Sequence, residues 1–152
     1  MRRLRGSFLP LSAALVAASA MVSEAGTFGR VVAIGGQAAD LVLDEARGVA
    51  YVANFTANRI EVMSLADGSV NTSINVSAQP SSLGLSPDGR FLAIGHFGNF
   101  SSPGTSANAL TLIDLNSRSR QTFVMRSPVL GLAFGIDGRA LIITPLRDRT
   151  HP

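Results

Sequence analysis

The sequence predicts an all-β protein that repeats one four-stranded unit. The first observation behind this prediction is the segment 82–95, in which two apolar runs flank the turn sequence Ser-Pro-Asp-Gly-Arg at residues 86–90. Proline presets φ at the second turn position, aspartate hydrogen-bonds nearby backbone, and glycine takes the left-handed conformation that closes a bulged loop. The segment is therefore expected to form a β-hairpin.

The second observation is that this hairpin recurs. Residues 41–54 align with residues 83–96 without a gap, at an offset of 42 residues, and a third copy at 132–143 begins 49 residues after the second. A period of roughly 20 to 50 residues indicates stacked structural units rather than one irregular fold.

The third observation is that two further strands follow each of the first two hairpins. Apolar runs at 59–65 and 109–115 are each followed by a turn and a more polar segment, 70–76 or 121–125. The first three strands are apolar on both faces, as expected between neighbouring sheets, whereas the fourth suits a solvated outer edge. Four antiparallel strands every ~40 to 45 residues are typical of the blade of a β-propeller.

The repeat resembles that of a known family. Tyr51-Val52-Ala53-Asn54, followed by residues 60–68 and 82–90, is similar to the YVTN-type propeller repeat of bacterial exported and surface proteins. The resemblance covers residues 28–144, although the second and third copies depart from the tetrapeptide, at 93–96 and 142–145. Propellers of this kind include lactonases, electron-transfer subunits and binding scaffolds, so the resemblance implies a fold and leaves the activity open.

The chain supplies too few strands to close a ring. A propeller needs at least ~4 blades, whereas the sequence predicts two full four-stranded blades, in units of about 38–80 and 81–128, a leading strand at 30–34 and a trailing hairpin within 129–152. We therefore expect an incomplete β-propeller, either the N-terminal part of a longer one or a truncated reading frame. Its open blade faces and strand edges favour self-association.

The first 25 residues have the three-part layout of a secretory signal peptide. A basic head at 1–5 precedes an apolar stretch at 8–18, and small residues surround two cleavage positions, at 18–20 and 23–25. We therefore predict a signal peptide at 1–25 and a mature chain of 26–152 in the periplasm or outside the cell. The alternative is an uncleaved anchor, but the apolar run is shorter than the ~20 residues of a bilayer span. No stable membrane span is expected after cleavage.

The charge of the chain is concentrated at this terminus. The formal net charge is +3 with a pI near 11.0, but removal of residues 1–25 leaves 10 arginines against 9 acidic residues. There is no lysine and no basic run interleaved with aromatic residues, so nucleic acid is not expected as a partner. The absence of cysteine excludes disulfides and cysteine-ligated metals.

The resemblance implies that one rim of the propeller is the ligand face. This rim is made by the loops that connect the fourth strand to the next blade and the second strand to the third. The candidate ligand-face residues on these loops are Gln37, Asn54, Phe55, Gln79, His96, Phe97, Asn99 and Phe100. The loop 96–107 is longer than its counterpart in the first unit. Such an extension suits recognition, and the plainer alternative is a tolerated Gly/Ser/Pro insertion.

No catalytic constellation is evident in the sequence. His96 is the only histidine inside the repeats, whereas a metal site needs about three converging ligands, so no metal or cofactor is predicted. The acids Asp44, Glu45, Asp67, Asp88 and Asp137 fall in turns, where carboxylates hydrogen-bond the backbone. Asp40 and Asp114 flank strands, and for these two a channel-facing role stays open.

Two hypotheses for the function follow. The first is an exported, non-catalytic binding or protein-interaction scaffold whose partner is a protein, a glycan or a small ligand. The alternative is the N-terminal part of a lactonase-like hydrolase or of a dehydrogenase or electron-transfer propeller subunit. Whether the chain is an enzyme stays open at this stage, with the scaffold preferred because no motif for a nucleophile or a bound phosphate is present.

Overall fold

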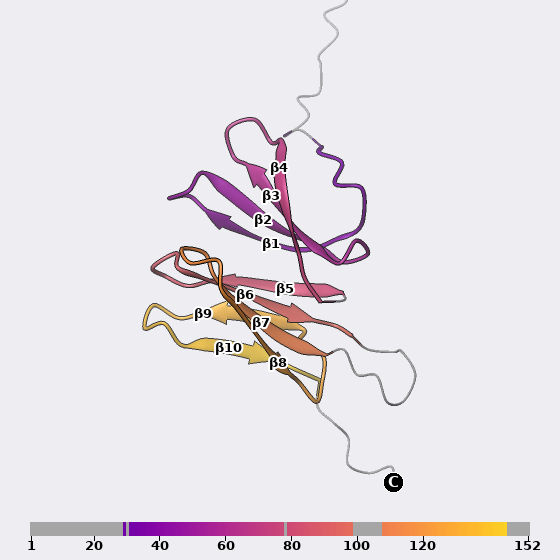
Figure 1. The fold of residues 1–152 in the computed structure, drawn as a ribbon, viewed down its shortest axis with the longest axis vertical. Coiled ribbons are helices and arrows are strands. Elements are labelled where there is room, and N and C mark those ends of the chain that lie inside the picture. Colours follow the sequence, from indigo (N-terminus) through magenta and orange to yellow (C-terminus); the bar gives the residue numbers. More distant parts are fainter. Residues whose placement is uncertain (1–28, 30, 78, 99–107, 146–152) are drawn as a thin grey trace, which may run out of the picture.

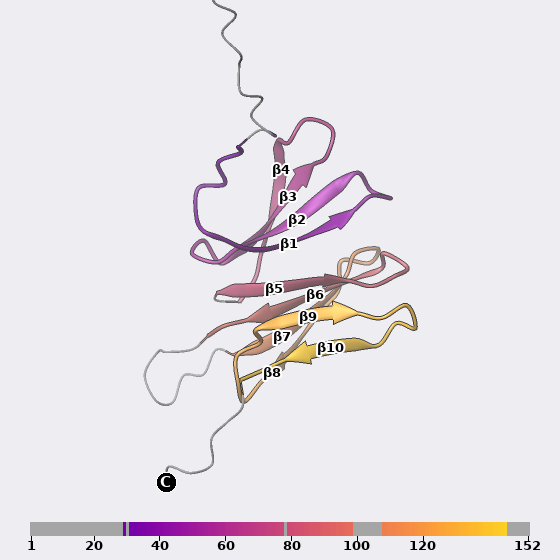
Figure 2. The same cartoon turned by 180° about the vertical axis from the view of Figure 1, so that it is seen from behind.

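The computed structural model describes residues 29, 31–77, 79–98 and 108–145. Within these residues the chain forms ten strands in three separate antiparallel sheets. The sheets follow one another along the long axis of the molecule, with the first sheet at the top of Figure 1 and the last strand pair beside the lower part of the second sheet. Figure 2 shows the same succession from behind.

Two of the sheets have the four strands that the repeat predicts, in chain order. Blade 1 consists of β1 (Ala38–Asp44), β2 (Val49–Asn54), β3 (Arg59–Ser64) and β4 (Val70–Asn75). Blade 2 consists of β5 (Pro80–Leu85), β6 (Phe91–His96), β7 (Ala109–Asp114) and β8 (Arg120–Val124). The trailing hairpin consists of β9 (Gly131–Phe134) and β10 (Ala140–Ile143).

The turn chemistry anticipated from the sequence is present in all three hairpins. Gly48, Gly89 and Gly138 have φ values of 65°, 67° and 78°, in the left-handed region that glycine adopts without steric cost. In the second hairpin, the Gly89 N–H donates to the Ser86 carbonyl at 2.8 Å. The hairpin predictions are confirmed.

The predicted leading strand at 30–34 is wrong for the residues that the structure describes. Residues 31–34 have no ladder partner, and the Ile34 carbonyl instead accepts a hydrogen bond from the Asn54 side chain at 3.1 Å. A strand is defined by its ladder with a neighbouring strand, and residues 31–34 form no ladder with the free edge of β1 or of β4.

The hydrophobic core lies between blades 1 and 2. Tyr51, Ala53 and Ile60 of blade 1 pack against four apolar residues of blade 2, Leu83, Leu92, Ile94 and Ile113. Ile60, Leu92 and Ile94 are fully buried, and burial of such a side chain stabilises a fold by about 1.5–3 kcal/mol. This interface therefore fixes how the two blades are placed.

The trailing hairpin packs closely on the other face of blade 2. A Cβ atom at Gly84 would overlap the Leu132 side chain, and one at Gly95 would overlap Ser82 and Val129. Gly84 is therefore required for the close approach of β9, and Gly95 for that of the segment before it. As a result, β5 contacts both β1 and β9.

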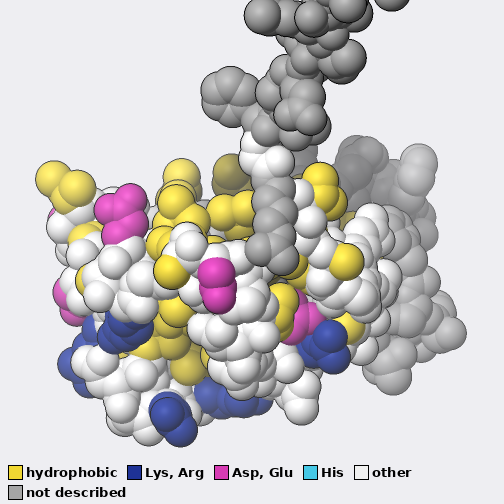
Figure 3. Space-filling view, turned by 90° about the horizontal axis from the view of Figure 1, so that it is seen from above, with side chains coloured by type: hydrophobic (Ala, Val, Ile, Leu, Met, Phe, Trp, Pro, Cys, Tyr) yellow, Lys and Arg dark blue, Asp and Glu magenta, His cyan; other side chains and the backbone are white. Residues whose placement is uncertain are grey.

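The outer strands and the two ends of the stack are exposed. All residues of β8 and five of the six residues of β4 are solvent-exposed, as predicted for the fourth strand of each unit. On β1, Leu41 and Leu43 are 59% and 49% exposed, and on β10 Leu141 is 68% exposed. Apolar side chains are visible on the face above blade 1 in Figure 3.

Two predictions concern parts of the chain outside these residues. The signal peptide at 1–25 and most of the long loop, at 99–107, lie outside the described residues. In the part that is described, no helix has the length and apolar character needed to cross a bilayer.

Candidate functional site

Four of the predicted ligand-face residues meet at one end of the two blades. Gln37 precedes β1 and Phe55 follows β2, while Gln79 and Phe97 take the same places in blade 2. The Phe55 N–H donates to the Gln37 carbonyl at 2.8 Å, and the Phe97 N–H donates to the Gln79 carbonyl at 2.9 Å. We refer to these four residues as the loop rim.

A hollow of about 280 Å³ opens between the two halves of the loop rim. It is lined by Gln37, Ala39, Phe55, Ser81 and Phe97. Ala39 and Ser81 lie where the pairing of β1 with β2, and of β5 with β6, shifts register. Such a bulge changes the direction of the strand, and both phenylalanine side chains remain partly accessible beside it.

Asn54 does not belong to this surface, contrary to the prediction. Its side chain is fully buried. The side-chain amide donates to the Ile34 carbonyl and to the Glu61 carboxylate at 2.9 Å, and its oxygen accepts the Ala57 N–H at 3.2 Å. Asn54 is therefore committed to the structure, since a buried amide must have its polar atoms paired.

The prediction for His96 is corrected in the same way. His96 is fully buried at the end of β6 on the face toward blade 1, and its Nε2 lies 2.9 Å from Thr111 Oγ1. Thr111 Oγ1 in turn lies 3.1 Å from Thr122 Oγ1 on β8. Because the imidazole is enclosed by this polar row, it does not reach the hollow. Asn99 and Phe100 lie outside the described residues.

The sequence reasoning missed the partners of these buried groups. Glu61 is buried and forms an ion pair with Arg59 at 2.6 Å, and Thr111 occupies the corresponding place in blade 2. A signal was available in the repeat, because Asn54 aligns with His96 and each ends an otherwise apolar run, at 49–54 and 91–96.

Solved structures with the same arrangement identify the fold. The chain is similar to Kuenenia stuttgartiensis hydrazine synthase, with a TM-score of 0.60 and 13% identity over 78% of this chain and 32% of that one. It is also similar to the Myceliophteria thermophila Cps50 (Swd1) β-propeller domain, with a TM-score of 0.51 and 19% identity over 65% and 29% of the two chains. The WD40 repeats of RRP9 match with a TM-score of 0.54 and 21% identity over 68% and 31%.

The chain is part of a β-propeller. Two complete blades and a trailing hairpin match these propellers, and the matched region spans about a third of the length of each. No family model and no curated protein sequence matches the chain. At these identities the likeness establishes the propeller fold alone.

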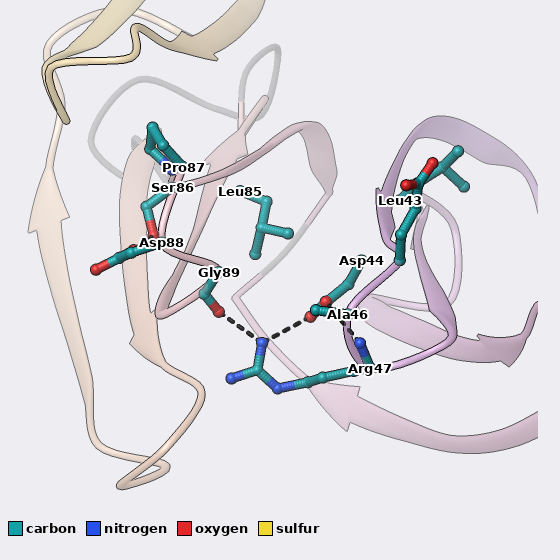
Figure 4. A pocket seen from close by; sticks show the side chains of 10 residues that line it. Leu43, Asp44, Ala46, Arg47, Leu85, Ser86, Pro87, Asp88 and Gly89 are labelled. Carbon is teal, nitrogen blue, oxygen red and sulfur yellow. Dashed lines mark hydrogen bonds and ion pairs between the residues drawn. The ribbon is translucent and has the colours of Figure 1, made fainter.

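The opposite end of the propeller blades holds a second hollow, which is built around an arginine. It measures about 590 Å³ and lies between the β1–β2 and β5–β6 turns, as Figure 4 shows. Arg47 Nη1 donates to Asp44 Oδ2 at 2.8 Å and to the Gly89 carbonyl at 2.7 Å, and Nη2 donates to Asn116 Oδ1 at 2.9 Å. Arg47 therefore joins blade 1 to blade 2, and its donors are directed at the protein.

Asp40, whose role the sequence left open, also joins the blades. Its Oδ2 accepts the Leu83 N–H of blade 2 at 2.8 Å. This bond crosses from β1 to β5, the innermost strands of their sheets. Asp40 is therefore a structural residue in this propeller.

Asp114 is also a structural residue, but its partners lie in its own blade. Its Oδ2 accepts hydrogen bonds from Arg90 Nε at 2.9 Å and Nη2 at 2.8 Å, while Oδ1 accepts the Asn116 and Ser117 N–H groups. The hydrogen bonds from Arg90, followed by those from the Ser117 and Asn116 backbone, lower the pKa of Asp114 to about 2. The carboxylate is therefore ionised at neutral pH.

Four acids in the predicted turns accept backbone hydrogen bonds, as expected. Asp44, Asp67, Asp88 and Asp137 accept from the N–H two or three residues later, at 3.0–3.1 Å. Within the described residues, no group of three or more His, Asp or Glu side chains is arranged to hold a metal ion. Glu45 also lies in a turn, but there its backbone carbonyl, not its carboxylate, accepts the Gly48 N–H at 3.1 Å.

Proposed function

We propose that this chain is an exported β-propeller module of the YVTN type that binds a partner protein without catalysing a reaction. The contact surface in this proposal is the loop rim. Export rests on the signal-peptide layout of residues 1–25, and the YVTN assignment rests on the resemblance of the repeat.

The observation that carries the proposal is that two equivalent phenylalanines, Phe55 and Phe97, line one open hollow together with Gln37. Phe55 and Phe97 are held at equivalent places by backbone bonds to Gln37 and Gln79, so their positions are set by the sheets. Partly exposed aromatic rings beside amides on loops of a rigid scaffold are typical of protein interfaces.

The size of the hollow favours a protein over a small molecule. Its volume of about 280 Å³ is at the lower limit of the ~300–1,000 Å³ found for small-molecule pockets. It can receive one or two side chains of a partner, with the phenylalanine rings in contact with them. Surfaces of this kind concentrate their binding energy in a few aromatic residues.

The proposal is tested by site-specific photocrosslinking of the full chain in a bacterial cell. A photoreactive phenylalanine analogue replaces Gln37 on the loop rim or, as the control, Ala46 on the exposed turn at the opposite end. We expect one discrete crosslinked product from position 37 and none from position 46. The double substitution Phe55→Ser and Phe97→Ser should remove that product.

Two results would overturn the proposal. One is equal crosslinking from both positions, or none from position 37. The other is hydrolysis of a lactone, or reduction of an electron acceptor, by the purified chain, which would support the enzymatic alternative. Export is tested separately by mass spectrometry of the secreted protein, which should begin near residue 26.

A further inference from the structure

A groove of about 530 Å³ lies between the outer strands of blades 1 and 2, separate from both hollows described above. Its apolar wall includes Val62 and Ile74 of blade 1 and Ile113 and Leu115 of blade 2, and it reaches inward to Tyr51. Both walls come from this chain, so the groove is complete whatever further blades a longer protein would add.

The mouth of the groove is positively charged. Arg118 and Arg120 line it and are exposed, and no acidic residue is among its described lining residues. Arg120 Nη1 donates to the Asn75 carbonyl at 2.9 Å, which fixes this side chain across the groove. Among the described residues, the Arg118 guanidinium has no hydrogen-bond or ion-pair partner.

Arg118 occupies a backbone position that disfavours it. Its φ is 61°, in the left-handed region, and the corresponding position in the β3–β4 turn of blade 1 is Gly68, with a φ of 69°. A side chain at such a position carries a steric cost that glycine avoids. A strained residue that adds an unpaired charge to a groove is typical of a functional position.

One wall of the groove is the free edge of a sheet. Residues 72–75 of β4 line it, and among the described strands β4 pairs with β3 alone. An exposed edge strand offers backbone groups to an extended peptide, while neighbouring pockets select alternate side chains. The groove thus combines an edge strand, an apolar wall and a positively charged mouth.

We propose that this groove binds an extended peptide segment of a partner protein in which aliphatic and acidic residues alternate. Successive side chains of an extended peptide point to opposite sides. The aliphatic side chains of the peptide contact the apolar wall, and its carboxylates face Arg118 and Arg120. The peptide sequence alternates in this proposal because the apolar lining residues lie deep in the groove, whereas the two arginines are exposed at its mouth.

The proposal is tested with a fluorescein-labelled heptapeptide, Glu-Val-Glu-Val-Glu-Val-Glu, titrated with the full chain in a fluorescence anisotropy assay. We expect saturable binding that weakens with increasing salt, because exposed charges are screened. The matched peptide with glutamine in place of glutamate should bind at least tenfold more weakly.

Three variants of the chain locate the site. Arg118→Gly installs the residue of the equivalent blade 1 turn, so the fold is kept while binding should weaken at least fivefold; adding Arg120→Gln should weaken it further. Arg126→Gln removes an exposed arginine that does not line the groove and should leave binding unchanged.

Each other outcome overturns the proposal. These outcomes are no saturable binding, equal binding of the glutamine peptide, or equal weakening by Arg126→Gln, which would indicate non-specific charge attraction. Loss of binding on Phe55→Ser and Phe97→Ser with no effect of Arg118→Gly would place the peptide on the loop rim instead.

Discussion

Blades 1 and 2 place different polar groups at the same positions of the repeat. In blade 1 the buried pair is Asn54 and Glu61, with Arg59 completing the network. In blade 2 the matching positions are His96 and Thr111, and Thr122 extends the row. The first network includes an ion pair and faces the open side of the stack, whereas the second joins a histidine to two threonines and lies on the face of blade 2 toward blade 1.

In both blades the buried polar side chains at these equivalent positions are hydrogen-bonded to each other, but the residue types that form the hydrogen bonds differ. A histidine or a glutamate enclosed in such a row reports on packing, since a buried polar group must be paired. The residues that differ without a packing reason, Arg118 against Gly68 above all, are better indicators of function.

The largest expected effect comes from Ile94 and its blade 1 counterpart, Val52. Ile94→Ala removes a fully buried side chain between the blades and should lower the free energy of unfolding by about 2–5 kcal/mol. Val52→Ala, on the open face of blade 1, should cost only about 1–2 kcal/mol. Urea denaturation at low protein concentration measures both, and equal losses would contradict the blade-specific core.

The next effect separates the two polar rows. Thr111→Val removes the hydrogen bonds to His96 Nε2 and Thr122 Oγ1 and should cost about 1–2 kcal/mol. Glu61→Gln keeps an acceptor for Asn54 and loses the ion pair to the partly exposed Arg59, at a cost of about 0.5–1 kcal/mol. The same denaturation assay ranks the two variants, and a larger loss for Glu61→Gln would show that the ionic row is the more important.

A third comparison removes the glycine from the β3–β4 turn and introduces one at the equivalent position of the β7–β8 turn. Gly68→Ala places a Cβ at a φ of 69° and should destabilise the chain by about 1 kcal/mol. Arg118→Gly relieves the same conformation and should raise stability by up to about 0.5–1 kcal/mol. Thermal melts of the two variants test the opposite signs, and a destabilising Arg118→Gly would mean that the Arg118 side chain contributes to folding.

The smallest expected effect is the acid sensitivity that Asp114 contributes in blade 2. Arg90 holds the pKa of Asp114 at about 2, below the ordinary 3.8, whereas blade 1 has Ser64 at the corresponding position. The ionised carboxylate therefore stabilises the fold above pH 3.8, and this contribution is lost as the pH falls toward 2.

Replacement of Arg90 exposes this contribution. Arg90→Gln should reduce the difference between the urea midpoints at pH 5 and pH 2, because the pKa of Asp114 returns toward its ordinary value. Arg126→Gln is the matched control for the loss of one positive charge. An unchanged difference in Arg90→Gln would show that the acid sensitivity comes from other carboxylates.

The local parts of the fold could be predicted from the sequence. The turn at 86–90 and its relatives specify hairpins because proline, aspartate and glycine each restrict the backbone within a few residues. The alternation of apolar residues and its recurrence then define four strands per unit. The structure places Gln37, Phe55, Gln79 and Phe97 at one end of the blades, whereas their role as a ligand face stays a prediction.

The errors lie where the outcome depends on a distant segment. Asn54 and His96 end their strands just before the rim loops. Asn54 is covered by the segment at 34–36 and bonded to Glu61, whereas His96 faces blade 1 and lies beside Thr111. Residues 31–34 have the composition of a strand, but they form no ladder, and the Ile34 carbonyl accepts a hydrogen bond from the Asn54 side chain instead. Arg118 faces residues of β4 that are more than 40 positions earlier.

The sequence by itself determined the repeated hairpin, the four-strand blade and the propeller class, because these depend on turn chemistry and on periodic burial within about 45 residues. Only the tertiary structure decided which polar residues are enclosed and which charges meet in the groove between the blades. Those outcomes depend on how two sheets face each other, and the contacts between sheets join residues that no local pattern connects.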